Sequence, residues 1–279
     1  MIITVASGKG GTGKTTVATS LAAAVPGPVR LLDCDVEEPN GHIFLRPTIH
    51  YRETVYAMVP EVDPSRCNLC GQCADICRFS AIAVVGRKIL TFPNLCHSCG
   101  GCLEVCPEKA VSEGRRELGE IELGESGEIR FAHGRLRVGE AMVPPLIREV
   151  RGQVGDADTV IIDAPPGTSC PVIAAMRGVD FILLVTEPTP FGLYDLKLAV
   201  EVVKTLAIPC GLVINRADLG DMRVRDYARQ EGLPVLLEIP FSREIARIYS
   251  RGGLLAREVP EWQEKFSELY EAIWSCRVC

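Results

Sequence analysis

Short apolar runs recur along the chain and alternate with stretches of helical length and period. The runs lie at residues 2–6, 29–32, 160–162, 181–185, 212–214 and 235–239. Such runs are typical of strands covered on both faces, as in parallel sheets. Stretches with a helical pattern occupy residues 15–25, 193–206 and 223–231. The alternation predicts βαβ units and therefore an α/β fold with a doubly wound, mostly parallel sheet.

The pattern changes between residues 61 and 112. Cysteines, prolines and short polar turns replace the apolar runs there, and no segment is long enough to join the predicted sheet. We therefore expect an α/β domain made of residues 1–60 and 113–279, with a small α+β module inserted at residues 61–112. Residues 115–139 are expected to form a hairpin that returns the chain to the sheet.

Composition and charge narrow the classes of partner. A chain of 279 residues that is 47% hydrophobic can bury one sizeable core and a small additional module. The net charge of −6 argues against a nucleic-acid partner. The sequence shows no signal peptide, and no run approaches the roughly 20 apolar residues that span a bilayer. We expect a cytoplasmic protein without membrane attachment, in which the 13 cysteines indicate metal ligation before disulfides.

A glycine-rich loop follows the first predicted strand. Residues 7–16 read SGKGGTGKTT, which fits the P-loop spacing. Its free N–H groups and the dipole of the following helix meet at one place, where they favour phosphate. Lys14 is expected to reach the β and γ phosphates and the Thr15 hydroxyl to bind Mg²⁺. The expected nucleotide contacts in the loop are Gly8, Gly10, Gly11, Thr12, Gly13, Lys14, Thr15 and Thr16.

Lys9 gives this loop the pattern KGGxGKT, which resembles the deviant P-loop of the MinD/Mrp/nitrogenase iron protein superfamily. The resemblance implies a weak ATPase that binds ATP or ADP with Mg²⁺ and forms a homodimer with ATP. It also implies that Lys9 reaches the nucleotide of the partner subunit, as an arginine finger does. The alternative interpretation of Lys9 is a solvated charge on a loop.

Two further segments resemble the switches of that superfamily. Residues 33–40, DCDVEEPN, resemble switch I, and this implies that Asp35 orients the attacking water. Residues 163–167, DAPPG, resemble switch II, in which Asp163 supports Mg²⁺ and the Gly167 N–H senses the γ-phosphate. The catalytic residues implied by the resemblance are Lys9, Lys14, Asp35 and Asp163. Either segment alone is weak, because an Asp at a strand end is often only a helix cap.

Two softer matches concern the base of the nucleotide. Asn215 ends an apolar run and matches the superfamily position that reads the adenine edge. Pro240 lies in a segment that resembles the one flanking the base. An Asn at a strand end is also a common turn residue, so this alternative stays open.

Two matched cysteine runs fill the inserted segment. One consists of Cys67, Cys70, Cys73 and Cys77, and the other of Cys96, Cys99, Cys102 and Cys106. The spacing is that of bacterial two-cluster ferredoxins, in which the fourth cysteine of each run binds the other cluster. One predicted [4Fe-4S] site is therefore Cys67, Cys70, Cys73 and Cys106, and the other is Cys96, Cys99, Cys102 and Cys77. Zinc is the alternative, although paired CxxC zinc sites usually have a longer arm between their halves.

Five cysteines remain outside these runs. Cys34 and Cys210 are expected to pack as small apolar side chains. Cys170 resembles in position the cluster cysteine of the nitrogenase iron protein, but packing at a helix end is the favoured interpretation. Cys276 and Cys279 form a CxxC that is either a further metal site or an inert tail.

Several functions are compatible with this combination. The first hypothesis is an ATPase that couples nucleotide-driven change to electron transfer for a partner redox or metallocofactor-assembly protein. The second is an Mrp-like iron-sulfur cluster carrier. A MinD-like positioning protein ranks last, because the amphipathic helix at residues 260–274 carries many acidic groups and is expected to pack on the core.

Overall fold

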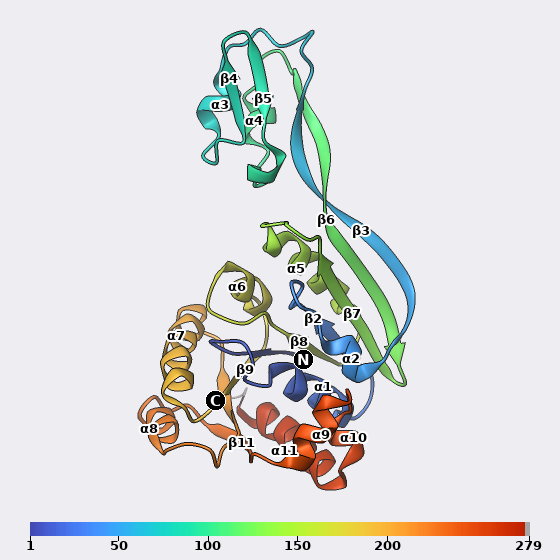
Figure 1. Ribbon diagram of the computed structural model, residues 1–279, viewed down its shortest axis with the longest axis vertical. Helices are drawn as coiled ribbons and strands as arrows, with labels where there is room; N and C mark the ends of the chain where they lie inside the picture. The colour runs from blue at the N-terminus through green and yellow to red at the C-terminus, as the bar shows by residue number, and fades with distance from the viewer. Residues whose placement is uncertain (277–279) are drawn as a thin grey trace. The chain divides into compact units, whose positions relative to one another are not determined.

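The computed structural model describes residues 1–276 (Figure 1). The chain divides into two compact units. The large unit comprises Met1–Glu53, Ile121–Arg135 and the chain from Ile147 onward, and the cysteine unit comprises Thr54–Glu120 and Leu136–Leu146. The cysteine unit is wider than the predicted insert at residues 61–112, because the chain on both sides of the cysteines belongs to it.

Within the described residues, nine strands form one sheet in the order β11-β10-β9-β1-β8-β2-β7-β6-β3. Neighbours from β11 to β7 are parallel. This confirms the mostly parallel α/β sheet. The strands are β1 (Ile2–Ala6), β2 (Val29–Asp33), β3 (Thr48–Val62), β6 (Val111–Ser126), β7 (Ile129–Leu136), β8 (Thr159–Asp163), β9 (Phe181–Thr186), β10 (Cys210–Asn215) and β11 (Val235–Ile239).

The order of the strands places a ligand crevice at the end of β1. Strand β1 pairs with β8 on one side and β9 on the other, so the next strand in sequence, β2, lies beyond β8. Every residue of β8 and β9 is buried, as the continuous apolar runs predicted. In doubly wound sheets, ligands bind outside the carboxyl ends of the strands at such a switch point.

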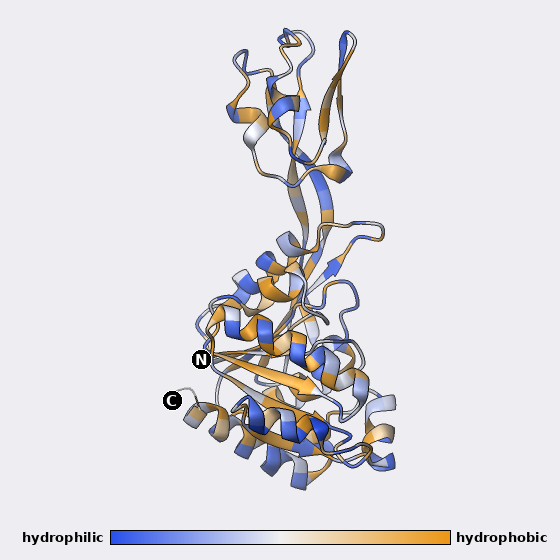
Figure 2. Cartoon of the chain, turned by 90° about the vertical axis from the view of Figure 1, so that its left-hand side faces the viewer, coloured by the Kyte–Doolittle hydropathy of each residue, from blue (hydrophilic) through white to orange (hydrophobic). Residues whose placement is uncertain are grey.

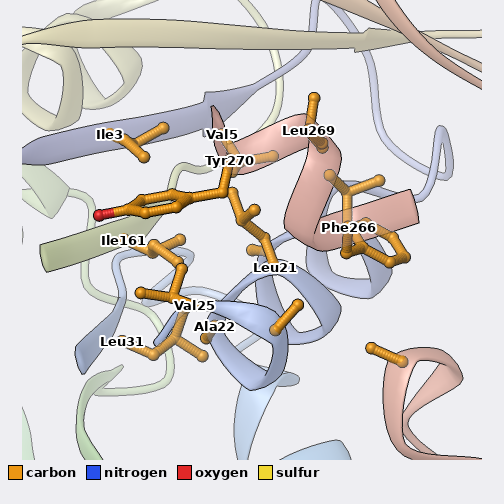
Figure 3. Close-up of a cluster of buried hydrophobic side chains, with 14 of the residues drawn as sticks. Ile3, Val5, Leu21, Ala22, Val25, Leu31, Ile161, Phe266, Leu269 and Tyr270 are labelled. Atoms are coloured by element: carbon orange, nitrogen blue, oxygen red, sulfur yellow. The ribbon is translucent and has the colours of Figure 1, made fainter. Parts of the chain in front are cut away.

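Helices α1 (Lys14–Ala24) and α11 (Pro260–Cys276) pack together on the main core. Figure 3 shows Leu21 and Ala22 of α1 beside Phe266 and Leu269 of α11. The predicted core packing of the last helix is therefore confirmed. The other helices of the large unit and its edge are α2 (Gly41–Leu45), α5 (Val143–Arg151), η2 (Gly152–Val154), α6 (Cys170–Met176), α7 (Pro190–Leu206), α8 (Arg223–Gln230), α9 (Arg243–Ser250) and α10 (Leu255–Glu258).

Hydropathy follows this arrangement. Figure 2 shows apolar residues along the central strands and hydrophilic residues on the outer turns of the helices. No helix among the described residues is both long and apolar enough to cross a membrane.

The cysteine unit repeats one backbone pattern twice. Its elements are α3 (Gln72–Ile76), the antiparallel pair β4 (Ile82–Val85) and β5 (Lys88–Thr91), η1 (Pro93–Leu95) and α4 (Gly101–Glu104). Left-handed residues stand at matching places in the two cysteine runs. Leu69 has a φ of 61° and Ser98 a φ of 56°, while Gly71 and Gly100 precede α3 and α4 with φ of 83° and 73°. The matched spacing of the cysteines is thus accompanied by a matched fold.

Candidate functional site

The glycine-rich loop joins β1 to α1 and is held closely by its surroundings. A Cβ atom at Gly8 would lie 2.2 Å from the carbonyl oxygen of Asp195 in α7. Gly13 has a left-handed φ of 96°, and a Cβ there would lie 2.5 Å from Asn215 Nδ2. Both positions therefore require glycine, which the P-loop pattern supplies.

A cavity of about 430 Å³ opens beside this loop. Its volume is within the range of small-molecule sites, roughly 300–1,000 Å³. Of the residues predicted to bind nucleotide or catalyse, it is lined by Gly10, Gly11, Gly13, Lys14, Thr15, Thr16, Asp35, Asn215 and Pro240. Gly8, Lys9, Thr12, Asp163 and Gly167 do not line it, although several contact residues that do. The fold therefore gathers side chains from β1, β2, β10 and β11 at one edge of the sheet.

The donors expected for Mg²⁺ are adjacent. The Thr15 hydroxyl donates to Asp163 Oδ2 at 2.6 Å, and Asp163 Oδ1 is buried without a hydrogen-bond partner among the described residues. Burial raises the pKa of Asp163 to about 6, although Lys14 and the Thr15 hydrogen bond act in the opposite direction. Mg²⁺ prefers oxygen donors and one or two carboxylates. An unpartnered buried carboxylate oxygen beside a hydroxyl fits such an ion.

Asp35 lines the cavity and lies near Asp163 and Asp33. Burial raises its pKa to about 6, against the effect of Lys14. Asp33, which we did not single out, is fully buried, and burial and the neighbouring Asp163 raise its pKa. Its carboxylate accepts hydrogen bonds from Asp35 N at 3.1 Å and Gly41 N at 2.8 Å. Asp33 thus fixes the start and the end of the loop that carries Asp35.

Two groups predicted to contact the nucleotide form hydrogen bonds within the chain instead. The Gly167 N–H donates to the Ser7 carbonyl at 3.0 Å, so sensing a γ-phosphate requires this bond to be released. Asn215 Nδ2 donates to the Thr12 carbonyl at 2.9 Å, which ties the end of β10 to the loop. The roles of Gly167 and Asn215 toward nucleotide stay predictions.

Lys9 has a counter-ion that the sequence did not reveal. Its Nζ atom lies 3.6 Å from Glu187 Oε2, and Arg216 Nη1 lies 2.7 Å from Glu187 Oε1. The Glu187 side chain is 9% exposed. Glu187 directly follows β9 and Arg216 directly follows β10, so only the folded sheet brings them to the loop. No local motif could have indicated this group.

The first predicted cysteine set surrounds one small cavity in the cysteine unit. Cys67, Cys70, Cys73 and Cys106 all line it. The Cys106 Sγ atom accepts a hydrogen bond from Ala110 N at 3.2 Å. The fourth residue of the second run therefore meets the first three residues of the first run, as the interleaved assignment requires.

The second set repeats one contact of the first. Cys77 Sγ accepts from Ala81 N at 3.2 Å, which repeats the Cys106 contact, and Cys77 packs against the small apolar cluster that contains buried Cys96. Among residues 1–276, no three His, Cys, Asp or Glu side chains converge closely enough to hold a single ion. A cubane takes one thiolate at each of its separate iron corners, so its ligands need not converge in this way.

The remaining cysteines are dispersed. Cys34 is buried and Cys210 half-buried, in agreement with packing roles, whereas Cys170 is exposed at the start of α6. Cys276 is half-buried at the end of α11, and Cys279 lies outside the described residues. The predicted metal role of the CxxC stays open.

Comparisons with known proteins agree with this fold. The family described as the CobQ/CobB/MinD/ParA nucleotide binding domain matches residues 3–255. An uncharacterized protein of Methanocaldococcus jannaschii is 32% identical over 98% of this chain and 96% of its own. An iron-sulfur cluster carrier protein of Aquifex aeolicus is 28% identical, over 38% of this chain and 34% of its own.

Among solved structures, the septum site-determining protein MinD of Pyrococcus horikoshii, complexed with Mg-ADP, superposes with a TM-score of 0.61. It is 21% identical, and the match covers 98% of this chain and 95% of that one. A MinC:MinD cell division complex from Aquifex aeolicus matches 98% of this chain and 96% of that one with a TM-score of 0.58. The P-loop, the cavity beside it and the family match together identify this chain as a nucleotide-binding ATPase of the CobQ/CobB/MinD/ParA family.

Proposed function

We propose that this chain is an ATPase whose cysteine unit holds two [4Fe-4S] clusters and transfers electrons to a partner redox or cofactor-assembly protein under the control of nucleotide. The observation that carries the proposal is the cavity lined by Cys67, Cys70, Cys73 and Cys106. These thiols come from both cysteine runs, and their meeting is specific to the interleaved arrangement of two-cluster ferredoxins. Such clusters supply one-electron transfer when bound.

The residues of the chain support cluster binding in a second way. Backbone N–H groups of Ala81 and Ala110 point at the sulfurs of Cys77 and Cys106 at 3.2 Å. Hydrogen bonds to the ligating sulfurs stabilise the more negative, reduced state of a cluster and are one of the factors that set its potential. The two matched contacts are therefore suited to a reducible site in each half of the unit.

In the large unit we assign roles that follow the superfamily pattern. Lys14 binds the β and γ phosphates, Thr15 and Asp163 hold Mg²⁺, and Asp35 orients the attacking water. Lys9 acts on the nucleotide of a second copy of the chain in an ATP-bound homodimer. For this it must leave Glu187, 3.6 Å away, so the dimer exchanges one ion pair for another.

A cluster carrier is the second candidate function. It is favoured by the similarity to proteins named iron-sulfur cluster carriers, including the one from Aquifex aeolicus at 28% identity. In this case the ferredoxin clusters would be retained and another, labile cluster passed on, with Cys276 as one ligand. Replacing Cys276 and Cys279 together separates the candidates. Loss of transferable iron with unchanged reduction of the remaining clusters supports a carrier.

Anaerobic metal and sulfide analysis of the purified chain tests the proposal. We expect about eight irons and eight sulfides per chain, the content of two [4Fe-4S] clusters. Stoichiometric zinc without sulfide contradicts it and favours structural thiolate sites. ATP binding is measured in the same preparation, because family members can require a partner for fast hydrolysis.

A further inference from the structure

Four side chains of the large unit form a polar cluster that does not line the nucleotide cavity. They are Arg52 of β3, Glu122 of β6, His133 of β7 and His42 of α2, and we name them the Glu122 cluster. His133 Nε2 lies 2.6 Å from Glu122 Oε2, and Arg52 forms an ion pair with Glu122 Oε1. The rings of His42 and His133 meet edge to face with centroids 5.2 Å apart. The cluster thus joins three strands and one short helix.

Glu122 and His133 are buried, His42 is half-buried and Arg52 is exposed, and the cluster is not fully satisfied. Burial lowers the pKa of His133, against the effect of Glu122. Burial acts to raise the pKa of Glu122, but hydrogen bonds from His133 and Arg52 outweigh it and hold that pKa below its ordinary value. The Nδ1 atoms of both histidines are buried without a hydrogen-bond partner within residues 1–276. Buried polar atoms without a partner are rare and costly, so this arrangement is under-satisfied.

On one side, the cluster is connected to the nucleotide loop. Helix α2 directly follows residues 35–40, of which Asp35, Glu38 and Asn40 line the cavity. Its first residue, Gly41, donates to Asp33 Oδ2 at 2.8 Å, and a Cβ there would lie 3.0 Å from the same oxygen. Because Gly41 is both the first residue of α2 and bonded to Asp33, we expect a displacement of residues 35–40 to move α2 and the His42 ring as well.

On the other side, the cluster is connected by the chain itself to the cysteine unit. Strand β3, which carries Arg52, ends at Val62 shortly before Cys67. Strand β6, which carries Glu122, begins at Val111 shortly after Cys106. We propose that the Glu122 cluster is a coupling element that transmits the position of residues 35–40 to β3 and β6, and through them to the cysteine unit. The coupling itself does not require bound clusters, and only its purpose, control of the cysteine unit, rests on the proposed function.

Hydrogen exchange on the full chain, with and without a non-hydrolysable ATP analogue and Mg²⁺, tests this. In the wild type we expect the analogue to change amide exchange at residues 48–53 and 121–126. In Glu122→Gln and His42→Leu we expect that change to fall at least about fivefold, the lower end of common coupling factors. Analogue affinity is expected to stay within about twofold, because neither side chain lines the cavity.

A matched control and a milder variant keep the test decisive. Glu238→Gln breaks the Arg225–Glu238 ion pair of 2.7 Å outside the cluster and should leave the nucleotide effect unchanged. Arg52→Gln alters a side chain that is 60% exposed, so it breaks the outer ion pair without emptying the core. The inference is overturned if these strands do not respond in the wild type, or if the cluster variants bind the analogue and respond fully. Amide exchange needs no iron, so missing clusters contradict the proposed function without deciding this result.

Discussion

The two units of this chain differ in how much apolar core surrounds their predicted sites. In the large unit, one apolar cluster extends from β1 through α1 to α11, and buried side chains such as Phe266 are fully enclosed. Next to the cysteines, two apolar clusters contain three buried residues each, and Cys73 and Cys96 are among them. Small units often add metals or disulfides to a limited apolar core. From this difference we expect the large unit to fold around its apolar side chains, and the cysteine unit to depend more strongly on groups bound by its cysteines.

Removal of one predicted cluster ligand is expected to have the largest effect of the changes considered. It should lower the iron content and leave the large unit unaffected. Cys73→Ala deletes a buried thiol that lines the first cysteine cavity. We expect between one and about four of eight irons to be lost, because the iron corner that loses its thiolate is no longer held by the chain. Cys210→Ala, at a half-buried cysteine of β10, is the matched control and should keep full iron content. Equal loss of iron in both variants would contradict the assignment of ligands.

Truncation of a core side chain should lower the stability of the large unit and leave the iron content unchanged. Phe266 is 0% exposed, and Phe266→Ala is expected to lower the free energy of unfolding of the large unit by about 3–5 kcal/mol. Iron content should remain unchanged under native conditions. Urea unfolding followed by the fluorescence of Trp262 and Trp274, both in α11, measures the effect, with Phe191→Ala as control, since Phe191 is 78% exposed. Comparable destabilisation by the two variants would show that α11 is not part of the core.

Loss of the P-loop lysine should affect nucleotide binding but neither stability nor clusters. Lys14→Ala is expected to weaken ATP binding about 10- to 100-fold, since hydrogen bonds to charged groups contribute about 1.5–3 kcal/mol. Isothermal titration with MgATP measures this. Lys204→Ala, which breaks an exposed ion pair with Glu231, should bind ATP normally. ATP affinity that survives the Lys14 change would place the nucleotide elsewhere.

The smallest expected effect concerns the carboxylate loop. The folded pKa of Asp35, raised to about 6, exceeds its unfolded value of about 3.9. The folded state therefore binds more protons between these values, and this side chain makes nucleotide-free protein less stable as pH rises from about 4 to 6. Asp35→Asn removes that effect, so it should stabilise the protein by about 1 kcal/mol at pH 7, after a discount for solvent screening. The gain should disappear near pH 4, and a gain independent of pH would contradict the raised pKa.

The sequence predicted most of the large unit because its strands are buried on both faces. Strand β3 was not predicted, because its first six residues, Thr48–Glu53, are exposed and do not form an apolar run. Helices α2 and α10 are too short to show a period. The P-loop and the cysteine spacing were recognisable because their chemistry fixes local spacing along the chain.

Residues that meet only in the fold could not be predicted in this way. Lys9, Glu187 and Arg216 come together through the order of β1, β9 and β10, which no local pattern encodes. The Glu122–His133 pair left one signal in the sequence. Both residues are equally far from the turn at Gly127 and Glu128, so the register of the predicted hairpin would have placed them opposite each other.

The most direct test of the account is electron paramagnetic resonance of the dithionite-reduced protein, recorded with and without MgATP. If nucleotide in the large unit controls the cysteine unit, two interacting S = 1/2 signals should be present, and their line shape or potential should change on addition of MgATP. The Lys14→Ala variant should show the same signals without the change. Cluster signals that are indifferent to MgATP, in protein that demonstrably binds it, would contradict coupling between the two units.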